Sequence, residues 1–296
     1  MTLEQLRIFV AVAERQHITR AATALNLTQS AVSSAITALE GRHGVALFDR
    51  VGRSIVLNQA GEAFLAEARG VLARVAAAEA ALADLSGLER GRLSIHASQT
   101  IASYWLPPRL TAFHAAHPGI ALDVAIGNTA QVARAVAEGA AEIGLVEGLV
   151  DDPVLNRTVI DQERLSLVVG PQHPWAVAPP DGDPDLTQTD WVLREQGSGT
   201  RSSFEAALAG RGLCLADLRI AMVLPGNEAV RSAVEAGAGA GVMSESLASL
   251  GVARGALVEL PIDLPVREFH LLRHKQRYRS RAGDVFVDIA KRHAKP

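Results

Sequence analysis

The sequence predicts three parts in series: a small, mainly α-helical N-terminal domain with a wing, one long helix, and a two-lobed α/β domain. Three observations predict this fold class. Apolar stripes at helical spacing fill the N-terminal segment, a proline-free heptad pattern follows it, and strand-like and helix-like segments alternate through the rest. The 296 residues are sufficient for about two domains of roughly 100 to 200 residues each.

Two short helices around a tight turn are predicted within residues 19–39. The first helix has small and apolar residues on one face, and the second has Val32, Ile36 and Leu39 at the spacing that buries one stripe. The turn is expected at Asn26, because asparagine tolerates a left-handed backbone. Two such helices form a helix-turn-helix, the motif that places its second helix in the major groove of DNA.

The second helix has Gln29, Ser30, Ser33 and Ser34 opposite its apolar stripe, and Thr28 is its expected N-cap. Glutamine can bond adenine through N6 and N7 together, and serine hydroxyls bond bases and phosphates. We therefore predict that these five residues contact DNA. From these residues alone, an ordinary amphipathic helix hairpin with a solvated Ser/Gln face is the alternative interpretation.

A wing is predicted directly after the second helix. Residues 46–50 and 53–57 are typical of two short strands, and Val51-Gly52 is the turn between them. The wing would hold Arg50 and Arg53 beside the second helix, where a guanidinium can pair with phosphate or enter a narrow minor groove. Both arginines are therefore predicted DNA contacts.

These motifs together resemble the winged helix-turn-helix of the LysR-type transcriptional regulators, from Leu3 to about Ala68. The resemblance implies a DNA-binding domain over residues 1–58. Ser30 stands where many members have proline, and Asn58-Gln59 replaces a threonine-containing pair, so phosphate contacts there differ from the family pattern. The residues that fit the pattern are Leu6, Phe9, residues 12–14, residues 19–22, Leu25, residues 29–33, Ile36, residues 39–40, residues 47–50 and residues 60–62.

A long helix is predicted over residues 59–87, because the segment lacks proline and carries a heptad seam. A seam of about three heptads cannot be buried on a small winged domain alone, so we expect it to pair with the same helix of a second chain; packing on the chain's own α/β domain is the alternative. The resemblance implies a homodimer or homotetramer, since LysR-type proteins dimerise through this helix. The seam consists of Phe64, Ala68, Val71, Val75, Ala78, Leu82 and Leu85.

Residues 91–296 are expected to form the α/β domain, with one lobe at about 91–164 and 268–296 and the other at about 165–267. Strands and helices alternate in βαβ order in both lobes, which predicts parallel sheets. The layout resembles the periplasmic-binding-protein-like effector domain of the LysR family. The predicted strands are 92–97, 121–126, 142–146, 165–169, 191–194, 220–224, 241–244, 257–260 and 267–272, and the predicted helices are 106–116, 130–138, 201–211, 228–236 and 280–292.

Open sheets of this kind bind ligands beyond the carboxyl ends of their strands. Two segments are expected at such strand ends: residues 97–100 in one lobe and residues 194–201 in the other, facing each other across the cleft. Their hydroxyl groups, glycine amides and one arginine are suited to binding an anion. A tight turn at the entry of a helix is the alternative interpretation of residues 197–200, which we call the glycine segment. Glu147 would repel an anion unless it pairs with Arg201. The predicted ligand-binding residues are Ser98, Gln99, Thr100, Gly197, Ser198, Gly199, Thr200 and Arg201, followed by Asn128, Thr129, Glu147 and Asn227.

The glycine segment resembles the one in LysR-type regulators of sulfur assimilation and carbon fixation, some of which respond to small anions or phosphorylated metabolites. The resemblance therefore implies a small, anionic effector. It also implies double-stranded promoter DNA and RNA polymerase as partners.

Composition restricts the other function classes. The net charge is −3, yet residues 1–60 contain six arginines and four acids, which suffices for DNA if two chains act together. The basic segment 267–295 is expected to be solvated. The single cysteine, Cys214, excludes an intrachain disulfide and a cysteine-rich zinc site, and no metal or cofactor is expected. With no long apolar run and no secretory pattern, we expect a cytoplasmic protein without membrane contact.

An enzyme or small-molecule-binding protein with an α/β cleft and an N-terminal helical interaction module is the main alternative. No GxSxG turn, P-loop or HExxH motif occurs, and the glycines of residues 237–241 follow a helix and precede a strand, the reverse of a dinucleotide loop. An architectural DNA binder would leave the large α/β domain unexplained. The sequence therefore predicts a ligand-responsive transcriptional regulator rather than an enzyme.

Overall fold

The computed structural model describes residues 1–51, 54–85, 91–180 and 182–292. The predicted DNA contact Arg53 lies outside these ranges. The chain divides into a smaller unit, mostly residues 1–82, and a larger unit that holds nearly all the rest. Each unit is described by itself.

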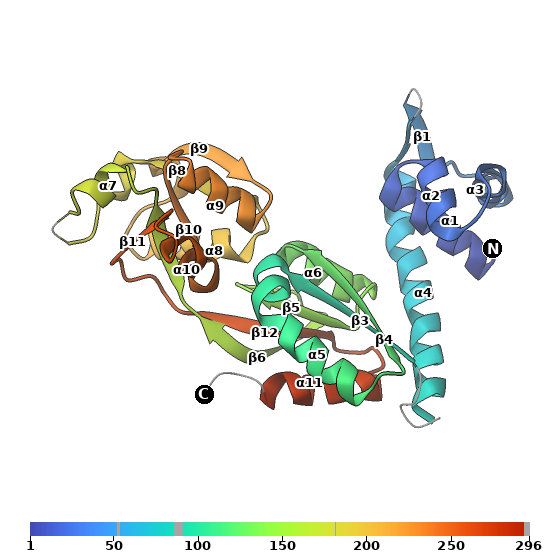
Figure 1. The fold of residues 1–296 in the computed structure, drawn as a ribbon. Coiled ribbons are helices and arrows are strands. Elements are labelled where there is room, and N and C mark those ends of the chain that lie inside the picture. Colours follow the sequence, from blue (N-terminus) through green and yellow to red (C-terminus); the bar gives the residue numbers. More distant parts are fainter. Residues whose placement is uncertain (52–53, 86–90, 181, 293–296) are drawn as a thin grey trace. The chain divides into compact units, whose positions relative to one another are not determined.

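The smaller unit contains three short helices, a two-stranded wing and a long helix (Figure 1). Thr2 caps the first helix in a reciprocal capping box with Gln5, which satisfies backbone N–H groups that have no partner within the helix. The elements are α1 (Leu3–Arg15), α2 (Ile18–Leu25), α3 (Gln29–His43), β1 (Phe48–Val51), β2 (Ser54–Leu57) and α4 (Gln59–Leu85).

The turn between α2 and α3 has the predicted chemistry. Asn26 adopts the left-handed conformation with φ 55°, and the Thr28 hydroxyl accepts a hydrogen bond from the backbone N–H of Ala31 at 3.2 Å. A left-handed residue ends α2 and a threonine cap begins α3. The helix-turn-helix geometry therefore follows from two local residues.

The core of this unit joins α1, the wing and the start of α4. Phe9 is fully buried, and its ring lies 5.4 Å from that of Phe48 and 4.9 Å from that of Phe64. A Cβ on Gly61 would lie 2.0 Å from the carbonyl oxygen of Leu47, so only glycine permits this approach of α4 to the wing. The first turns of α4 therefore belong to the N-terminal core.

The first lobe of the larger unit is built on a five-stranded sheet in the order β4-β3-β5-β12-β6. Strand β3 pairs parallel with β4 and β5, whereas β12 pairs antiparallel with β5 and β6. The elements are β3 (Gly91–Ser98), a π-helical turn (Ile101–Trp105), α5 (Leu106–Ala116), β4 (Ile120–Gly127), α6 (Thr129–Glu138), β5 (Ile143–Glu147), β6 (Leu155–Glu163), β12 (Arg267–His274) and α11 (Arg281–Arg292).

The second lobe has the sheet order β11-β7-β10-β8-β9. Strand β8 pairs parallel with β9 and β10, and β7 pairs antiparallel with β10 and β11. The elements are β7 (Leu165–Val169), α7 (Pro174–Val177), β8 (Asp190–Arg194), α8 (Gly199–Ala209), β9 (Arg219–Leu224), α9 (Asn227–Glu235), β10 (Ala240–Ser244), α10 (Glu245–Val252) and β11 (Val258–Leu260), with 3₁₀ turns at Leu186–Gln188 and Leu215–Asp217.

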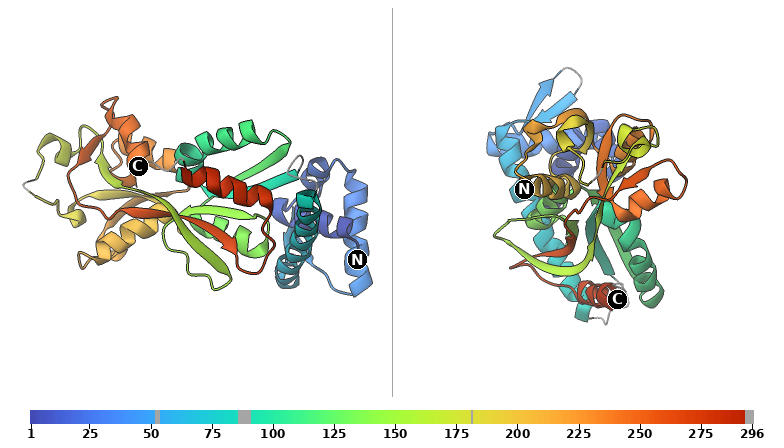
Figure 2. Two further views of the ribbon diagram at one scale, coloured as in Figure 1. Left: turned by 90° about the horizontal axis from the view of Figure 1, so that it is seen from below. Right: turned by 90° about the vertical axis from the view of Figure 1, so that its left-hand side faces the viewer.

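Helices cover both faces of each sheet (Figures 1 and 2). In the first lobe, α5 and α11 pack on one face through Phe113 and Phe286, and α6 packs on the other through Val132 and Val136. In the second lobe, α8 covers one face, while α9 and α10 cover the opposite face. Burial on both faces explains the continuous apolar runs of the central strands.

The chain crosses between the lobes twice, from β6 into β7 and from β11 into β12. The prediction of parallel sheets is correct only for β3, β4 and β5 in the first lobe and for β8, β9 and β10 in the second. The strands next to the lobe crossings, β6 and β12 in the first lobe and β7 and β11 in the second, pair antiparallel. Strand β6 and helix α10 were not predicted, because they lack a clear period within short segments.

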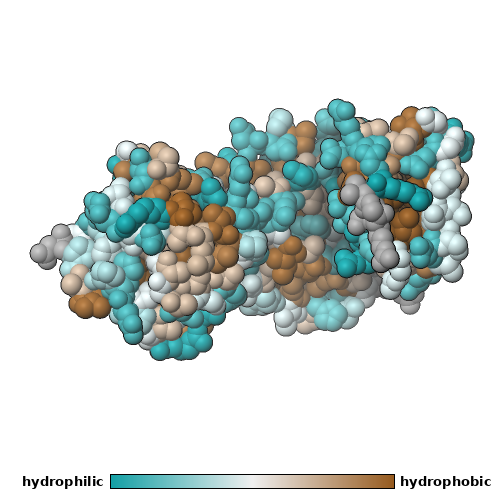
Figure 3. Space-filling model, turned by 90° about the horizontal axis from the view of Figure 1, so that it is seen from above, coloured by the Kyte–Doolittle hydropathy of each residue, from teal (hydrophilic) through white to brown (hydrophobic). Residues whose placement is uncertain are grey.

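On the face of the molecule that the space-filling view shows, hydrophobic residues form patches between hydrophilic residues (Figure 3). Within the described ranges, no helix combines the length and the apolar character that a membrane span requires.

Candidate functional site

The predicted DNA-contact residues lie on one side of α3. Thr28, Gln29, Ser30 and Ser34 are exposed, and Ser33 is half-buried. The apolar stripe of the same helix is buried, as predicted. This surface is polar and carries no acidic side chain, so it is suited to a DNA groove.

The wing presents Arg50 to solvent from β1. Asn58, which departs from the family pattern, has a structural role: its Oδ1 accepts the N–H of Gly61 at 2.9 Å, and its Nδ2 donates to the carbonyl of Ala46 at 3.0 Å. Asn58 therefore caps α4 and fixes it to the wing.

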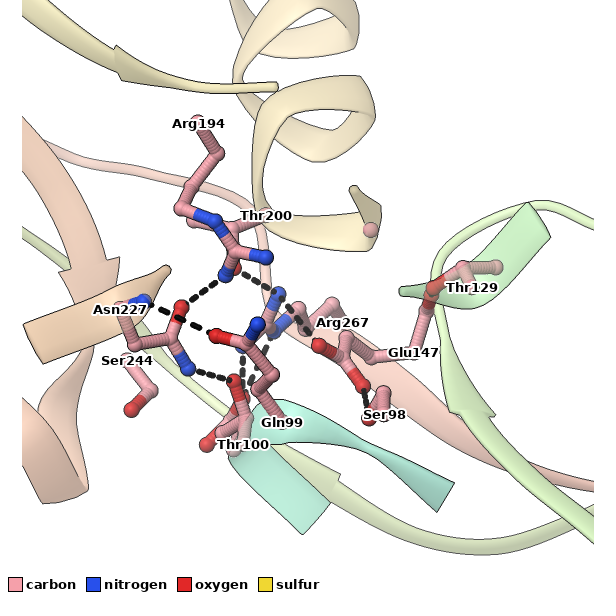
Figure 4. Close-up of polar contacts among 12 residues, drawn as sticks. Ser98, Gln99, Thr100, Thr129, Glu147, Arg194, Thr200, Asn227, Ser244 and Arg267 are labelled. Atoms are coloured by element: carbon pink, nitrogen blue, oxygen red, sulfur yellow. Dashed lines mark hydrogen bonds and ion pairs between the residues drawn. The ribbon is translucent and has the colours of Figure 1, made fainter. Parts of the chain in front are cut away.

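A second group of predicted residues forms a buried polar cluster between the two lobes (Figure 4). In the first lobe, Ser98 at the end of β3 donates to the carboxylate of Glu147 at the end of β5. Thr129, the first residue of α6, donates to the backbone carbonyl of Glu147 at 2.7 Å. The carboxyl ends of β3, β4 and β5 thus bring these three residues together, at the edge where open sheets bind ligands.

Residues of the second lobe complete the cluster. Asn227, the first residue of α9, donates through Nδ2 to the hydroxyl of Thr100 at 3.0 Å, and its backbone N–H donates to Oε1 of Gln99 at 3.0 Å. Asn128 donates to the carboxylate of Glu195 at 3.2 Å. These hydrogen bonds cross from one lobe to the other, and they join Gln99 and Thr100 to the start of α9 rather than to the glycine segment.

Arg267 is the centre of the cluster, although it was not predicted as a site residue. It begins β12, and its guanidinium donates to Glu163 through Nε at 2.7 Å and to the hydroxyl of Thr200 through Nη1 at 3.0 Å. Nη1 also lies 3.8 Å from the carboxylate of Glu147. One buried cation therefore links both crossing strands and both lobes.

Burial raises the pKa of Glu163 to about 7, although the charge and hydrogen bonds of Arg267 act in the opposite direction. A carboxyl group in a low-dielectric environment favours its neutral form. The Arg267–Glu163 pair is therefore sensitive to pH near neutrality.

Arg194 is the second buried arginine of the cluster, and it too was not predicted as a ligand residue. It forms a two-point ion pair with Glu195, at 2.7 Å and 2.9 Å, and donates to the side chain of Asn227. Burial opposes ionisation of Glu195, but the hydrogen bonds and charge of Arg194 prevail and lower its pKa. The available sequence evidence for Arg194 was its place after the apolar run Trp191–Leu193. Arg267 begins a strand that also contains Glu268, His270 and Arg273, so no local pattern distinguished it.

Arg201 does not pair with Glu147, the condition under which Glu147 would not repel an anion. The guanidinium of Arg201 donates to Glu205 at 2.8 Å and to the backbone carbonyl of Arg194 at 3.3 Å. The cause is helical spacing, because an i,i+4 glutamate on the same helix is the nearest acceptor. Glu147 is instead paired with Arg267.

At the glycine segment, the backbone of the second lobe lies close to the backbone and side chains of the first lobe. Gly197 has φ 87°, a left-handed conformation that favours glycine. A Cβ on Gly199 would lie 2.1 Å from the carbonyl oxygen of Glu147 and 2.7 Å from Oγ1 of Thr129. Ser198 and Thr200 are buried on either side. The glycines therefore let the start of α8 reach the first lobe.

The geometry agrees with the comparisons to known families. Residues 3–62 match the bacterial regulatory helix-turn-helix protein family of the lysR type, and residues 86–295 match the LysR substrate binding domain. The chain belongs to the LysR family. It is a DNA-binding transcriptional regulator with an effector-binding domain, so the predicted family, fold class and general function are confirmed.

Individual relatives and solved structures are similar to the chain over most of its length. It is 32% identical to the uncharacterised HTH-type transcriptional regulator YeiE of Escherichia coli K12, over 97% of this chain and 96% of YeiE. Full-length CbnR in complex with its target DNA has the same fold, with a TM-score of 0.69 and 22% identity over 99% of this chain and 100% of CbnR. The regulatory domain of Synechocystis CcmR with 2-PG has a TM-score of 0.62 and 26% identity over 70% of this chain and 98% of that domain.

Proposed function

We propose that the regulator binds a small anionic effector in the buried polar cluster between its lobes. The observation that supports this most strongly is the meeting of three helix N-termini at the cluster: α6 begins at Thr129, α8 at Gly199 and α9 at Asn227. The first N–H groups of a helix have no acceptor within it, and the helix dipole adds positive potential there. Such termini bind anions.

The hydroxyl groups of the cluster are a second argument for anion binding. The hydroxyl of Thr100 accepts from Asn227 and can donate its own hydrogen to a ligand, whereas the hydroxyls of Ser98 and Thr129 donate to Glu147 and would have to turn from it to reach a ligand. The structure of CcmR with 2-PG supports the proposal, since it has a small ligand in a domain of this fold. A ligand that contacts both lobes would stabilise one interlobe arrangement over another, which is what coupling to DNA requires.

Removal of two hydroxyl groups tests this site. The test uses an anion that raises the melting temperature of the wild-type protein. In the double variant Ser98→Ala/Thr100→Val, we expect the affinity for this anion to fall by about 10- to 100-fold, because two hydrogen bonds of about 1 kcal/mol each are lost. Thermal-shift titrations with a panel of small carboxylates and oxyanions measure this. Ser203→Ala, on α8 but outside the cluster, is the control and retains wild-type affinity. A double variant with wild-type affinity would place the effector elsewhere.

We also propose that α3 and the wing bind promoter DNA, with Gln29 in direct contact with a base. The variant Gln29→Ala is expected to weaken specific binding by about 1–3 kcal/mol, with little effect on non-specific binding. Fluorescence anisotropy with operator and scrambled duplexes gives both affinities. Gln188→Ala, an exposed glutamine of the α/β domain, is the matched control. An unchanged ratio of the two affinities would remove Gln29 from base recognition.

Finally, we propose that α4 joins two copies of the chain, as a dimer or a dimer of dimers, and that the DNA-bound assembly engages RNA polymerase. Phe64 and Ala68 of the seam pack in the N-terminal core, whereas Val71 and Leu82 are 41% and 69% exposed. Exposed apolar seam residues support pairing with a second helix. Sedimentation equilibrium that shows only monomer would contradict this assembly.

A further inference from the structure

The carboxylate of Glu147 lies among the donors that an anionic ligand would use. One of its oxygens accepts from Ser98, the other lies 3.8 Å from Nη1 of Arg267, and its side chain is only 3% exposed (Figure 4). A carboxylate has acceptor positions and no donors. A ligand oxygen that reaches Ser98 and Arg267 therefore also meets an acceptor.

With Glu163 ionised, the charges around this position are balanced. Arg194 is paired with Glu195, and Arg267 is paired with Glu163. Glu147 is thus a third carboxylate beside two guanidinium groups. An oxyanion without a proton would bring further negative charge and lone pairs against Glu147, and an unpaired buried charge is strongly unfavourable.

A ligand with an O–H group meets the opposite situation. Its hydroxyl can donate to the carboxylate of Glu147, and an O–H···O⁻ hydrogen bond is short and strong. Sites built to bond a ligand hydroxyl reject analogues without it by large factors. Glu147 keeps Ser98 and Arg267 as partners, so the analogue is disfavoured by the repulsion between its oxygen and this buried carboxylate.

We infer that Glu147 makes the interlobe cluster selective for anions that present an O–H group, namely protonated oxyanions and hydroxylated carboxylates, over oxyanions of the same shape without a proton. The inference rests on the proposed effector site and adds the class of ligand that it takes. Helix N-termini and hydroxyl donors attract the anion, and Glu147 accepts its proton-bearing oxygen.

Inorganic phosphate and sulfate form the probe pair, because both are tetrahedral and similar in size, but at neutral pH phosphate retains a proton and sulfate has none. Calorimetric titration of the full chain is expected to give an affinity for phosphate at least about 100-fold above that for sulfate. This comparison needs no variant. In Glu147→Gln, whose amide can donate, the ratio is expected to fall to within about tenfold, mainly because sulfate binding improves. Glu259→Gln, at an exposed glutamate of β11, is the control and keeps the wild-type ratio.

The outcomes separate the two proposals. Equal wild-type affinity for both ions, or an undiminished phosphate preference in a folded Glu147→Gln protein, overturns the role of Glu147. Binding of neither ion by the wild type, together with no protection by glycolate, overturns the effector site itself. Near-ultraviolet circular dichroism establishes that each variant is folded.

Discussion

Replacement of Arg267 by methionine is expected to lower the free energy of unfolding of the α/β domain by about 3–5 kcal/mol at pH 8. The side chains of Arg267, Glu147 and Glu163 are 4%, 3% and 10% exposed. Methionine fills a similar volume but leaves two buried carboxylates without their cation. Urea unfolding followed by tryptophan fluorescence measures the loss, because all three tryptophans lie beyond residue 100 and so report on this domain.

Arg201→Met is the matched control for this change. Its guanidinium is 21% exposed and pairs with a glutamate that is 42% exposed, so the loss is expected to be below about 1 kcal/mol. The double variant Arg267→Met/Glu163→Gln removes one of the stranded charges, and it is expected to recover part of the stability. Equal losses for Arg267→Met and Arg201→Met would show that the cluster does not hold the lobes together.

The fold of the DNA-binding domain was largely predictable because its determinants are local. Asn26 and Thr28 fix the turn, and Val32 and Ile36 fix the buried side of α3 within a few residues of each other. Periodicity and capping chemistry contain this information. The role of Asn58 as cap and wing fastener was missed, since it depends on the distant backbone of Ala46.

The interlobe cluster was predictable only in part. Ser98 and Thr129 follow from the rule that ligands bind beyond strand ends, which needs only the order of strands and helices. Arg267 could not be placed in this way, because its position depends on a strand that returns from the other lobe after more than a hundred residues. For this reason sequence reasoning considered only Arg201 as a partner for Glu147 and missed Arg267. Long-range pairing in the sheet, rather than local pattern, decides which charges meet.

Lowering the pH from 8 to 5 is expected to stabilise the α/β domain through Glu163. Burial raises the pKa of this group to about 7 from 4.5, so the folded state holds the proton more tightly than the unfolded state does. The stabilisation is complete below about pH 4.5 and is lost as the pH rises through 7. A shift of this size corresponds to a free energy on the order of 3 kcal/mol. The charged groups that act on Glu163 are Arg267, which favours ionisation, and Glu147 and Glu245, which oppose it.

The variant Glu163→Gln isolates this contribution, since glutamine does not titrate. Burial lowers the pKa values of His173 and His270, and both contribute with the opposite sign, but equally in the two proteins. The difference in unfolding free energy between wild type and Glu163→Gln is therefore expected to change by a few kcal/mol between pH 5 and pH 8. Glu259→Gln, at an exposed glutamate of β11, should show no such change. A pH-independent difference for Glu163→Gln would mean that Arg267 keeps Glu163 ionised throughout. A neutral Glu163 releases Arg267 from its strongest partner, so the same titration determines whether this cation is available to an anionic ligand near neutral pH.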